Sequence, residues 1–280
     1  MGERLLPPDP LPIPQSGIQR EGEQGNGPLL SLSACTVRFG GLTAVSEFTL
    51  EIATGELVGL IGPNGAGKTT IFNAITGVHP VAEGGIQFAG HTISGLPPHR
   101  IAKLGIARTF QNIRLFKGLT VLDNLRTAMH QDSDYGLLRA AARSRTWEHT
   151  EATISAAAGD LLAMFDMQDR AEELAGSLPY GDQRRVEILR ALATKPKLLL
   201  LDEPAAGMNP SETTRLMDLV RHLRDELGLP ILLIEHDMRF VMGICDRVVV
   251  LNYGKEIAAG LPRDIARSPA VIEAYLGEPE

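Results

Sequence analysis

The chain has 280 residues, enough for one large or two modest domains with a buried core, and this length excludes short peptides and fibrous repeats. Its 27 Lys and Arg against 34 Asp and Glu give a formal net charge of −7 at pH 7, which argues against a general nucleic-acid binder because phosphate contacts need a basic surface. No apolar run approaches the ~18–20 residues of a membrane-spanning helix. The only two cysteines, Cys35 and Cys245, have no metal-ligand spacing and fit a reducing cytosol.

The N-terminal region differs in composition from the rest of the chain. Residues 1–28 contain six Pro and five Gly and lack the apolar stretch of a signal peptide, so we expect a disordered tail. From residue 29 onward, alternating apolar and polar residues over Leu29–Ile52 and Gly85–Ile93 predict the short strands of a small β subdomain.

A phosphate-binding loop is predicted after the next strand. The apolar run Leu57–Ile61 leads into the pattern G-x-x-x-x-G-K-[ST], and a helix is predicted from Thr70 onward. In this context backbone N–H groups and the positive end of the helix dipole attract an anion. We expect Lys68 to reach the β- and γ-phosphates and Thr69 to offer its hydroxyl to Mg²⁺; the alternative is a chance glycine-rich turn. The residues predicted to bind nucleotide here are Gly62, Pro63, Asn64, Gly65, Ala66, Gly67, Lys68, Thr69 and Thr70.

The middle of the chain, between Phe116 and Leu178, has a helical pattern. Thr120 with Asp123 predicts a helix start. We interpret two apolar stripes that follow as packing surfaces: Val121, Leu122, Leu125 and Met129, then Trp147, Ile154, Leu161 and Phe165. The basic cluster of Arg139, Arg143 and Arg145 is interpreted as a solvated loop, with lipid headgroups as the alternative ligand.

Two later strands end in polar residues. The apolar run Leu198–Leu201 ends in Asp202 and Glu203, and Ile231–Ile234 leads to His236. Ligands of parallel α/β sheets bind at the carboxyl ends of the strands. Asp202 is therefore predicted to hold Mg²⁺ and Glu203 to orient or deprotonate an attacking water, while His236 senses the γ-phosphate. The alternatives are a solvated strand end and a structural histidine.

Together these motifs resemble the ATP-binding subunit of ABC transporters. They occur in the order and approximate spacing of that family, and the resemblance covers about residues 29–280. The motifs are the loop Gly62–Thr69, Gln111 in A-R-T-F-Q-N, the stretch L-P-Y-G-D-Q-R-R from Leu178, the run L-L-L-L-D-E-P, Ala206–Asn209 and His236. The resemblance implies a P-loop NTPase core with a mainly parallel sheet, a small antiparallel β subdomain and an inserted α-helical subdomain.

The resemblance also implies roles for particular residues. Phe39 is similar to the aromatic residue that stacks on adenine, with a strand core residue as the alternative. Gln111 resembles the glutamine that contacts Mg²⁺ and the attacking water and moves with the membrane subunit, and Ala206–Asn209 resembles a loop that crosses the dimer interface. The segment Leu178, Pro179, Tyr180, Gly181, Asp182 and Gln183 resembles the signature segment, which binds in trans the γ-phosphate held by a partner subunit. The resemblance thus assigns catalysis to Glu203, His236 and Gln111, and Mg²⁺ to Thr69, Gln111 and Asp202.

Within this family the chain is most similar to the ATP-binding subunit of branched-chain amino acid importers. The similarity rests on Y-G-x-Q-R-R, D-E-P-A-A-G-M-N-P, L-L-I-E-H-D-M and the ending V-I-E-A-Y-L-G. Related urea or amide importers are the alternative. The implied cofactors are ATP and Mg²⁺. The implied partners are integral membrane permease subunits, a second ATPase subunit and, indirectly, a periplasmic or extracellular solute-binding protein, with no nucleic acid. The implied location is peripheral, on the cytoplasmic face of the cell membrane.

The expected organisation is a tail over 1–28 and an ATP-binding domain over 29–280. Within that domain we expect a core at 29–115 and 185–255, a helical insertion at 116–184 and a C-terminal segment at 256–280.

Three other classes share the ATPase motifs. A chromosome or repair ATPase would carry long coiled-coil arms, but only about 110 residues separate Lys68 from Gly181, with no sustained heptads. A ribosome-acting factor would normally carry two ATPase cassettes, and one set of motifs is present. A decayed, non-enzymatic subunit would have lost motif residues that are intact here.

The signature segment departs from the family pattern L-S-G-G-Q. Pro179 and Asp182 replace its serine and glutamine, and Tyr180 lies between them. Pro179 offers neither a hydroxyl nor an N–H, and Asp182 either repels phosphate or caps a helix that starts near Gln183. Because this segment acts in trans, we expect a heterodimer with a different ATPase subunit and two sites of unequal activity.

Overall fold

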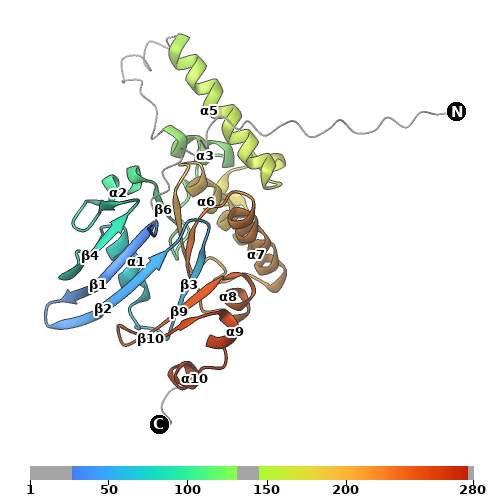
Figure 1. Ribbon diagram of the computed structural model, residues 1–280. Helices are drawn as coiled ribbons and strands as arrows, with labels where there is room; N and C mark the ends of the chain where they lie inside the picture. The colour runs from blue at the N-terminus through green and yellow to red at the C-terminus, as the bar shows by residue number, and fades with distance from the viewer. Residues whose placement is uncertain (1–26, 131–144, 277–280) are drawn as a thin grey trace.

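The computed structural model describes residues 27–130 and 145–276 (Figure 1). Almost all of the expected N-terminal tail lies outside the described residues, as do Arg139 and Arg143 of the basic cluster.

A six-stranded sheet forms the centre of the molecule, with strand order β10-β9-β3-β8-β7-β6. All of its neighbouring pairs are parallel except β10 with β9. This confirms the mainly parallel core that the sequence predicts. The strands are β3 (Leu57–Ile61), β6 (Ile106–Arg108), β7 (Leu198–Asp202), β8 (Ile231–Ile234), β9 (Arg247–Asn252) and β10 (Lys255–Gly260).

A second, antiparallel sheet has the order β2-β1-β4-β5. It comprises β1 (Leu30–Phe39), β2 (Leu42–Ile52), β4 (Glu83–Phe88) and β5 (His91–Thr92). These strands lie where the alternating pattern predicts the small β subdomain.

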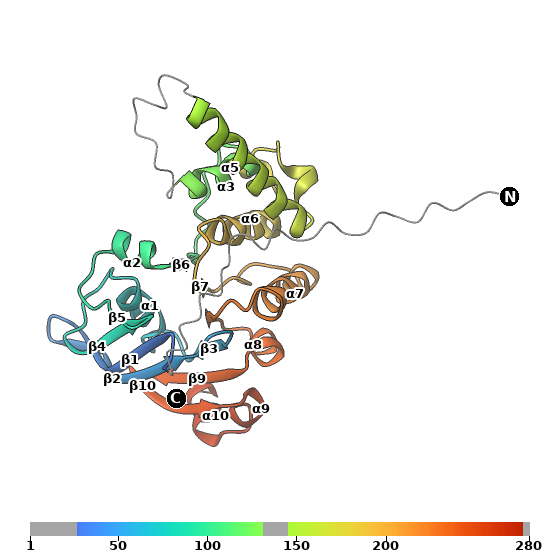
Figure 2. The ribbon, with the colours of Figure 1, turned by 45° about the horizontal axis from the view of Figure 1, so that its top comes forward.

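Helices cover the central sheet and form a separate group at one end of the molecule. Figures 1 and 2 show α3 and α5 together beyond the sheet, next to α6, while α1 and α2 lie on the side of the antiparallel sheet. The helices are α1 (Lys68–Ile75), α2 (Pro98–Leu104), α3 (Val121–Met129), α5 (Arg145–Met164), α6 (Tyr180–Leu192), α7 (Pro210–Asp225), α8 (Met238–Ile244), α9 (Pro262–Ile265) and α10 (Pro269–Leu276).

The central strands face two different cores because their side chains alternate. On β7, Leu198 and Leu200 pack with the antiparallel sheet and α1, whereas Leu199 and Leu201 pack with the helices of the opposite face. All four leucines are fully buried. Burial on both faces explains why β7 is a continuous apolar run and not an alternating one.

The helical region begins as the sequence predicts. The hydroxyl of Thr120 accepts a hydrogen bond from the backbone N–H of Asp123 at 3.0 Å and so caps α3. Val121 and Leu125 are fully buried, in agreement with a packing stripe. The expected domain boundary at 184/185 falls inside α6. The side chain of Trp147 lies outside the described residues.

The two sheets meet at the turn between β9 and β10. In this turn Gly254 donates its N–H to Ala66 O and accepts from the N–H of Ser46, both at 2.9 Å. Its φ is +77°, and a Cβ there would lie 2.5 Å from Ala44 O. Glycine is therefore required where the turn joins β2 to the loop that follows β3.

Candidate nucleotide site

Three parallel strands bring the predicted site residues to one edge of the sheet. Strand β8 pairs with both β3 and β7, with Ile234 opposite Leu60 on one side and Asp202 on the other. The segments that follow these strands therefore lie next to one another, as expected for the carboxyl edge of a parallel sheet.

The phosphate loop lies between β3 and α1. Gly65 and Gly67 have positive φ values of +79° and +105°, and a Cβ at Gly67 would lie 2.8 Å from Ala44 O. Helix α1 starts at Lys68 with no side-chain cap, and Thr69 is exposed. The first amides of a helix have no intrahelical acceptor, so this loop and helix start suit an anion.

Lys68 is held inside the loop. Its Nζ donates to Gly62 O at 2.7 Å and Pro63 O at 2.9 Å, and the residue is 5% exposed. Burial lowers the pKa of Lys68, and the charges of Glu203 and Asp202 act in the opposite direction. The ammonium group therefore lies within electrostatic reach of both carboxylates.

Glu203 lies at the centre of a three-residue cluster. Its Oε1 lies 2.9 Å from His236 Nε2, and its Oε2 accepts from Gln111 Nε2 at 2.8 Å. Glu203 has a φ of 47°, in the left-handed region that is uncommon for non-glycine residues. A carboxylate held on both oxygens in this way can accept a proton from a nearby water.

Asp202 is buried and paired with an arginine. Its Oδ2 accepts from Arg108 Nη2 at 2.8 Å, and the two side chains are 5% and 8% exposed. Arg108 also donates to Asn73 Oδ1 at 2.8 Å, which ties the carboxylate to α1. The pair fixes the position of a potential Mg²⁺ ligand.

Phe39 lies at the end of β1 and is 44% exposed. Its ring contacts the ring of His79 edge-to-face, with centroids 4.9 Å apart. The side chain is thus not a strand core residue, and its stacking on adenine stays a prediction.

The signature segment differs from expectation at its helix. Helix α6 begins at Tyr180 and not near Gln183, and its N-cap, Pro179, provides no side-chain cap. Asp182 does not cap the helix either; it pairs with Arg170 at 3.5 Å and Arg185 at 3.6 Å.

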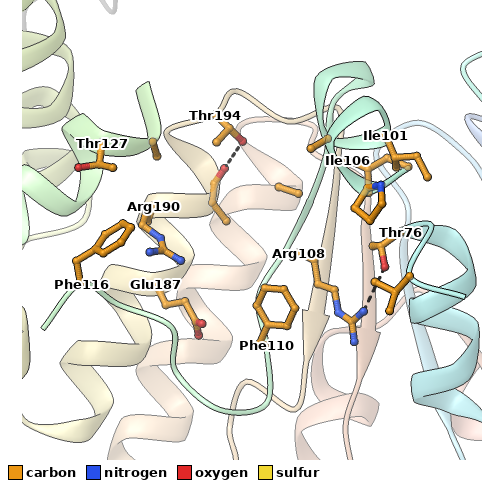
Figure 3. A pocket seen from close by; sticks show the side chains of 16 residues that line it. Thr76, Ile101, Ile106, Arg108, Phe110, Phe116, Thr127, Glu187, Arg190 and Thr194 are labelled. Carbon is orange, nitrogen blue, oxygen red and sulfur yellow. Dashed lines mark hydrogen bonds between the residues drawn. The ribbon is translucent and has the colours of Figure 1, made fainter. Parts of the chain in front are cut away.

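A cavity of about 470 Å³ lies beside the loop that carries Gln111. Figure 3 shows Ile101 of α2 and Thr76, which follows α1, on one side and Thr127 of α3 with Glu187 and Arg190 of α6 on the other. We call this cavity the interdomain groove, because it lies between the sheet-based core and the helical region.

Comparison with known proteins places these motifs in a family. Residues 45–206 match the model of the ABC transporter family, and residues 255–280 match the branched-chain amino acid ATP-binding cassette transporter model. This chain belongs to the ABC transporter family. The high-affinity branched-chain amino acid transport ATP-binding protein LivG of Escherichia coli K12 is 46% identical over 251 residues, which cover 90% of this chain and 98% of that protein. The corresponding protein BraF of Pseudomonas aeruginosa is 45% identical with the same coverage.

Solved ABC cassettes share the fold. A nucleotide-free ATP-binding cassette from an ABC transporter superposes with a TM-score of 0.77 at 30% identity, covering 90% of this chain and 100% of the other. A cassette in its ADP conformation also gives 0.77 at 30% identity, covering 90% and 99%. The α/β P-loop fold inferred from the sequence is confirmed, and as an ABC cassette the chain is an ATPase that binds nucleotide.

The residues of this ABC site fit Mg²⁺ as well as nucleotide. Thr69 offers an exposed hydroxyl next to Lys68, Asp202 offers a carboxylate, and Gln111 offers an amide oxygen. Oxygen donors of these types are those that Mg²⁺ prefers. The donor set is incomplete without phosphate oxygens and water, which is usual for Mg²⁺ bound with a nucleotide.

The sequence did not indicate two residues with buried side chains that contact the predicted site. One is Arg108. The other is Glu235, which is 3% exposed and whose carboxylate accepts from the backbone N–H of Ala205 at 2.6 Å and of His236 at 3.0 Å. Glu235 thus joins the loops that carry Glu203 and His236. In the sequence, Glu235 could have been found from its place between β8 and His236.

Among the helices in residues 27–130 and 145–276, none combines the length and the apolar character of a membrane-spanning segment.

Proposed function

We propose that this chain is the ATP-hydrolysing subunit of an ABC importer for branched-chain amino acids. The observation that carries hydrolysis is the cluster of Glu203 with Gln111 and His236 at the edge where the phosphate loop lies. The solute class is supported by the LivG and BraF relatives and by the match of residues 255–280 to the branched-chain amino acid transporter model.

In the proposed reaction the chain's own residues bind the phosphates, orient the carboxylate of Glu203 and accept a proton from the attacking water. Lys68 leaves the carbonyls of Gly62 and Pro63 to contact the phosphates, and the amides at the start of α1 bind them. Glu203 accepts the proton of the attacking water, and His236 and Gln111 keep its carboxylate oriented. Mg²⁺, when bound, neutralises charge that develops on the phosphate oxygens.

The proposed partner at the membrane is a permease subunit that docks in the interdomain groove. The groove is lined by Phe110 and Phe116, which flank Gln111 in the chain, and Phe116 is 50% exposed. A permease segment seated there contacts the Gln111 loop from one side and α3 and α6 from the other. Binding to the permease also accounts for the proposed peripheral location on the cytoplasmic face of the membrane.

The test uses the chain assembled with its permease subunits, its second ATPase subunit and its solute-binding protein in proteoliposomes. Wild-type complex should accumulate leucine in the presence of MgATP. Glu203→Gln keeps the side-chain shape but removes the proton acceptor, so ATP turnover at this chain's site should fall by about 10²–10⁴ while ATP still binds. A dimer with trapped ATP should accumulate.

The matched control is Glu226→Gln, an exposed glutamate at the end of α7, which should leave turnover unchanged. Wild-type turnover in Glu203→Gln would contradict its role as the base and direct attention to His236. Uptake of urea or short amides in place of leucine, isoleucine and valine would change the proposed solute and leave the ATPase role intact.

A further inference from the structure

Arg184 is a buried charge in α6 that the proposed reaction does not use. It is the largest of the fully buried side chains among the described residues, with 0% exposure. One turn later in α6, Glu187 is 2% exposed and its Oε2 accepts from Arg184 Nη1 at 2.7 Å. A buried ion pair recovers little net stability compared with apolar residues of similar volume, so its presence calls for another explanation.

The other hydrogen bonds of this pair hold the loop that carries Gln111. Arg184 donates to the backbone oxygens of Phe110 and Gln111, both at 2.7 Å. Glu187 Oε1 accepts from the backbone N–H of Arg114 at 3.0 Å. The pair thus binds backbone groups on both sides of the Gln111 side chain.

The loop between β6 and α3 has no strand or helix of its own, so side-chain contacts hold its backbone: Arg184 and Glu187 around Gln111, and Asn124 at Phe116. The Gln111 side chain in turn donates to Glu203. A shift of the loop therefore moves the amide group away from the carboxylate that accepts the proton.

The same pair reaches two other surfaces. Arg184 Nη2 lies 3.2 Å from the hydroxyl of Tyr180 in the signature segment. Glu187 lines the interdomain groove. One rigid pair on α6 thus connects the groove, the Gln111 loop and the signature segment.

We propose that Arg184 and Glu187 are positioning residues that make the Gln111 loop and the signature segment move as one body when a permease segment occupies the groove. The inference rests on the proposed function. Its consequence is that the site in cis, through Gln111, and the site in trans, through the signature segment, respond together to the permease.

The test replaces the pair by apolar residues in the assembled transporter. Arg184→Met with Glu187→Met removes both charges at once, so no unpaired charge remains buried, and the thermal midpoint should stay at or above that of the wild type. Solute-stimulated kcat should fall about 10- to 100-fold, because a displacement of about 1 Å at a reacting group has effects of this size. The KM for ATP should change less than about twofold, since neither residue contacts the phosphate loop.

A second readout follows the loop directly. Amide hydrogen exchange in the isolated chain should become faster over residues 109–116 in the double variant and stay unchanged in α7 and α8. Arg184→Lys is the conservative variant: it keeps the charge beside Glu187, but one ammonium nitrogen with three donors cannot make the four hydrogen bonds that the two Nη atoms of Arg184 make. It should retain the wild-type thermal midpoint and show a smaller loss of kcat.

Arg224→Met provides the matched control. Arg224 also bonds a backbone oxygen, that of Ile244, and a carboxylate, that of Asp246, but it lies on α7 away from the Gln111 loop. It should leave kcat and the exchange of residues 109–116 unchanged.

A double variant and an Arg184→Lys variant that both keep wild-type kcat would overturn the proposal. So would a double variant whose kcat falls without faster exchange in residues 109–116. If the double variant does not fold, Arg184→Lys alone decides, and wild-type kcat in that variant overturns the proposal. Failure of the proposed function is a separate result, because wild-type complexes would then neither hydrolyse ATP nor accumulate solute.

Discussion

The contacts of Lys68 in the phosphate loop define what a nucleotide must replace. Its ammonium group donates to two carbonyl oxygens of the loop and is nearly buried. Removing it by Lys68→Ala should delete a charged hydrogen bond to phosphate worth about 1.5–3 kcal/mol, which corresponds to a roughly 10- to 150-fold weaker Kd for MgATP. Titration with a fluorescent ATP analogue measures this.

The control for this variant is Lys103→Ala, which removes an exposed lysine from α2. It should bind ATP as the wild type does. Unchanged ATP affinity in Lys68→Ala would show that the lysine does not reach the phosphates.

The burial of Glu235 makes the free energy of unfolding depend on pH. Burial raises the pKa of Glu235, and the amide hydrogen bonds from Ala205 and His236 oppose this rise only in part. Between the unfolded and the folded pKa the native state binds more protons than the unfolded state. The free energy of unfolding therefore falls as pH rises through this window.

We expect the stability of the wild type relative to Glu235→Gln to increase as pH falls from 7 toward 5. Urea unfolding at several pH values measures the difference between the two free energies of unfolding. A difference that is constant, or that shrinks toward pH 5, would contradict the raised pKa of this carboxyl group.

Residues at the ends of apolar strands were predictable from the sequence. Glu203 and His236 each follow a run of buried aliphatic residues, and parallel strands bring such ends to one edge. Arg108 was not predictable, because its function depends on a partner, Asp202, that is 94 residues away in the chain. Glu235 has the same limitation: the sequence does not say which of several neighbouring carboxylates turns inward.

Helix α7 starts with a complete capping box, at the end of the Ala206–Asn209 loop. The side chain of Asn209 accepts from the N–H of Glu212 at 3.0 Å, and the Glu212 side chain accepts from the N–H of Asn209 at 3.0 Å. Glu212 also lies against the signature segment, since a Cβ on Gly181 would be 2.8 Å from its Oε1. The capping box thus joins the starts of α6 and α7.

Asn209→Ala should lower the free energy of unfolding by about 0.5–2 kcal/mol through the loss of this cap. Ser211→Ala, at an exposed position in the first turn of the same helix, should change it by less than about 0.5 kcal/mol. Urea denaturation measures the free energy of unfolding of the wild type and both variants. Equal values for Asn209→Ala and the wild type would show that the cap contributes nothing to stability.

Helix starts were predicted to within two residues at α1, which begins at Lys68 and not at Thr70, and at α3, where a capping side chain marks the first turn. Thr120 marks the start of α3. The start of α6 was placed about one turn too late, because Tyr180, Gly181 and Asp182 form its first turn without an apolar stripe, and Pro179 before them has no capping side chain. Proline is nevertheless compatible with a helix start, since its missing N–H would have no intrahelical partner there.

At the scale of the assembled molecule, the signature segment predicts two unequal ATP sites. Pro179 carries no hydroxyl, and the carboxylate of Asp182 is paired with Arg170 and Arg185. We therefore expect a heterodimer in which this chain's weakened segment faces the ATP held by its partner.

The variant Pro179→Ser with Asp182→Gln should accelerate hydrolysis of the ATP held by the partner. That site is measured alone by adding Glu203→Gln to this chain. The ATP held by Lys68 and Thr69 is measured alone with a partner disabled in its own general base. Faster hydrolysis only at this chain's own phosphate loop would show that the trans arrangement is wrong. A thermal midpoint for each variant is required, because serine at position 179 can also cap α6.

The turn at Gly254 has a consequence for cooperativity. Gly254 bonds the phosphate loop through its N–H and β2 through its carbonyl oxygen. The turn therefore links the phosphate loop to the antiparallel sheet. A nucleotide bound to the loop contacts a segment that is hydrogen-bonded to this turn, and the turn in turn bonds β2 of the antiparallel sheet. We therefore expect a nucleotide bound at the loop to restrain, through Gly254, the position of the antiparallel sheet relative to the central sheet.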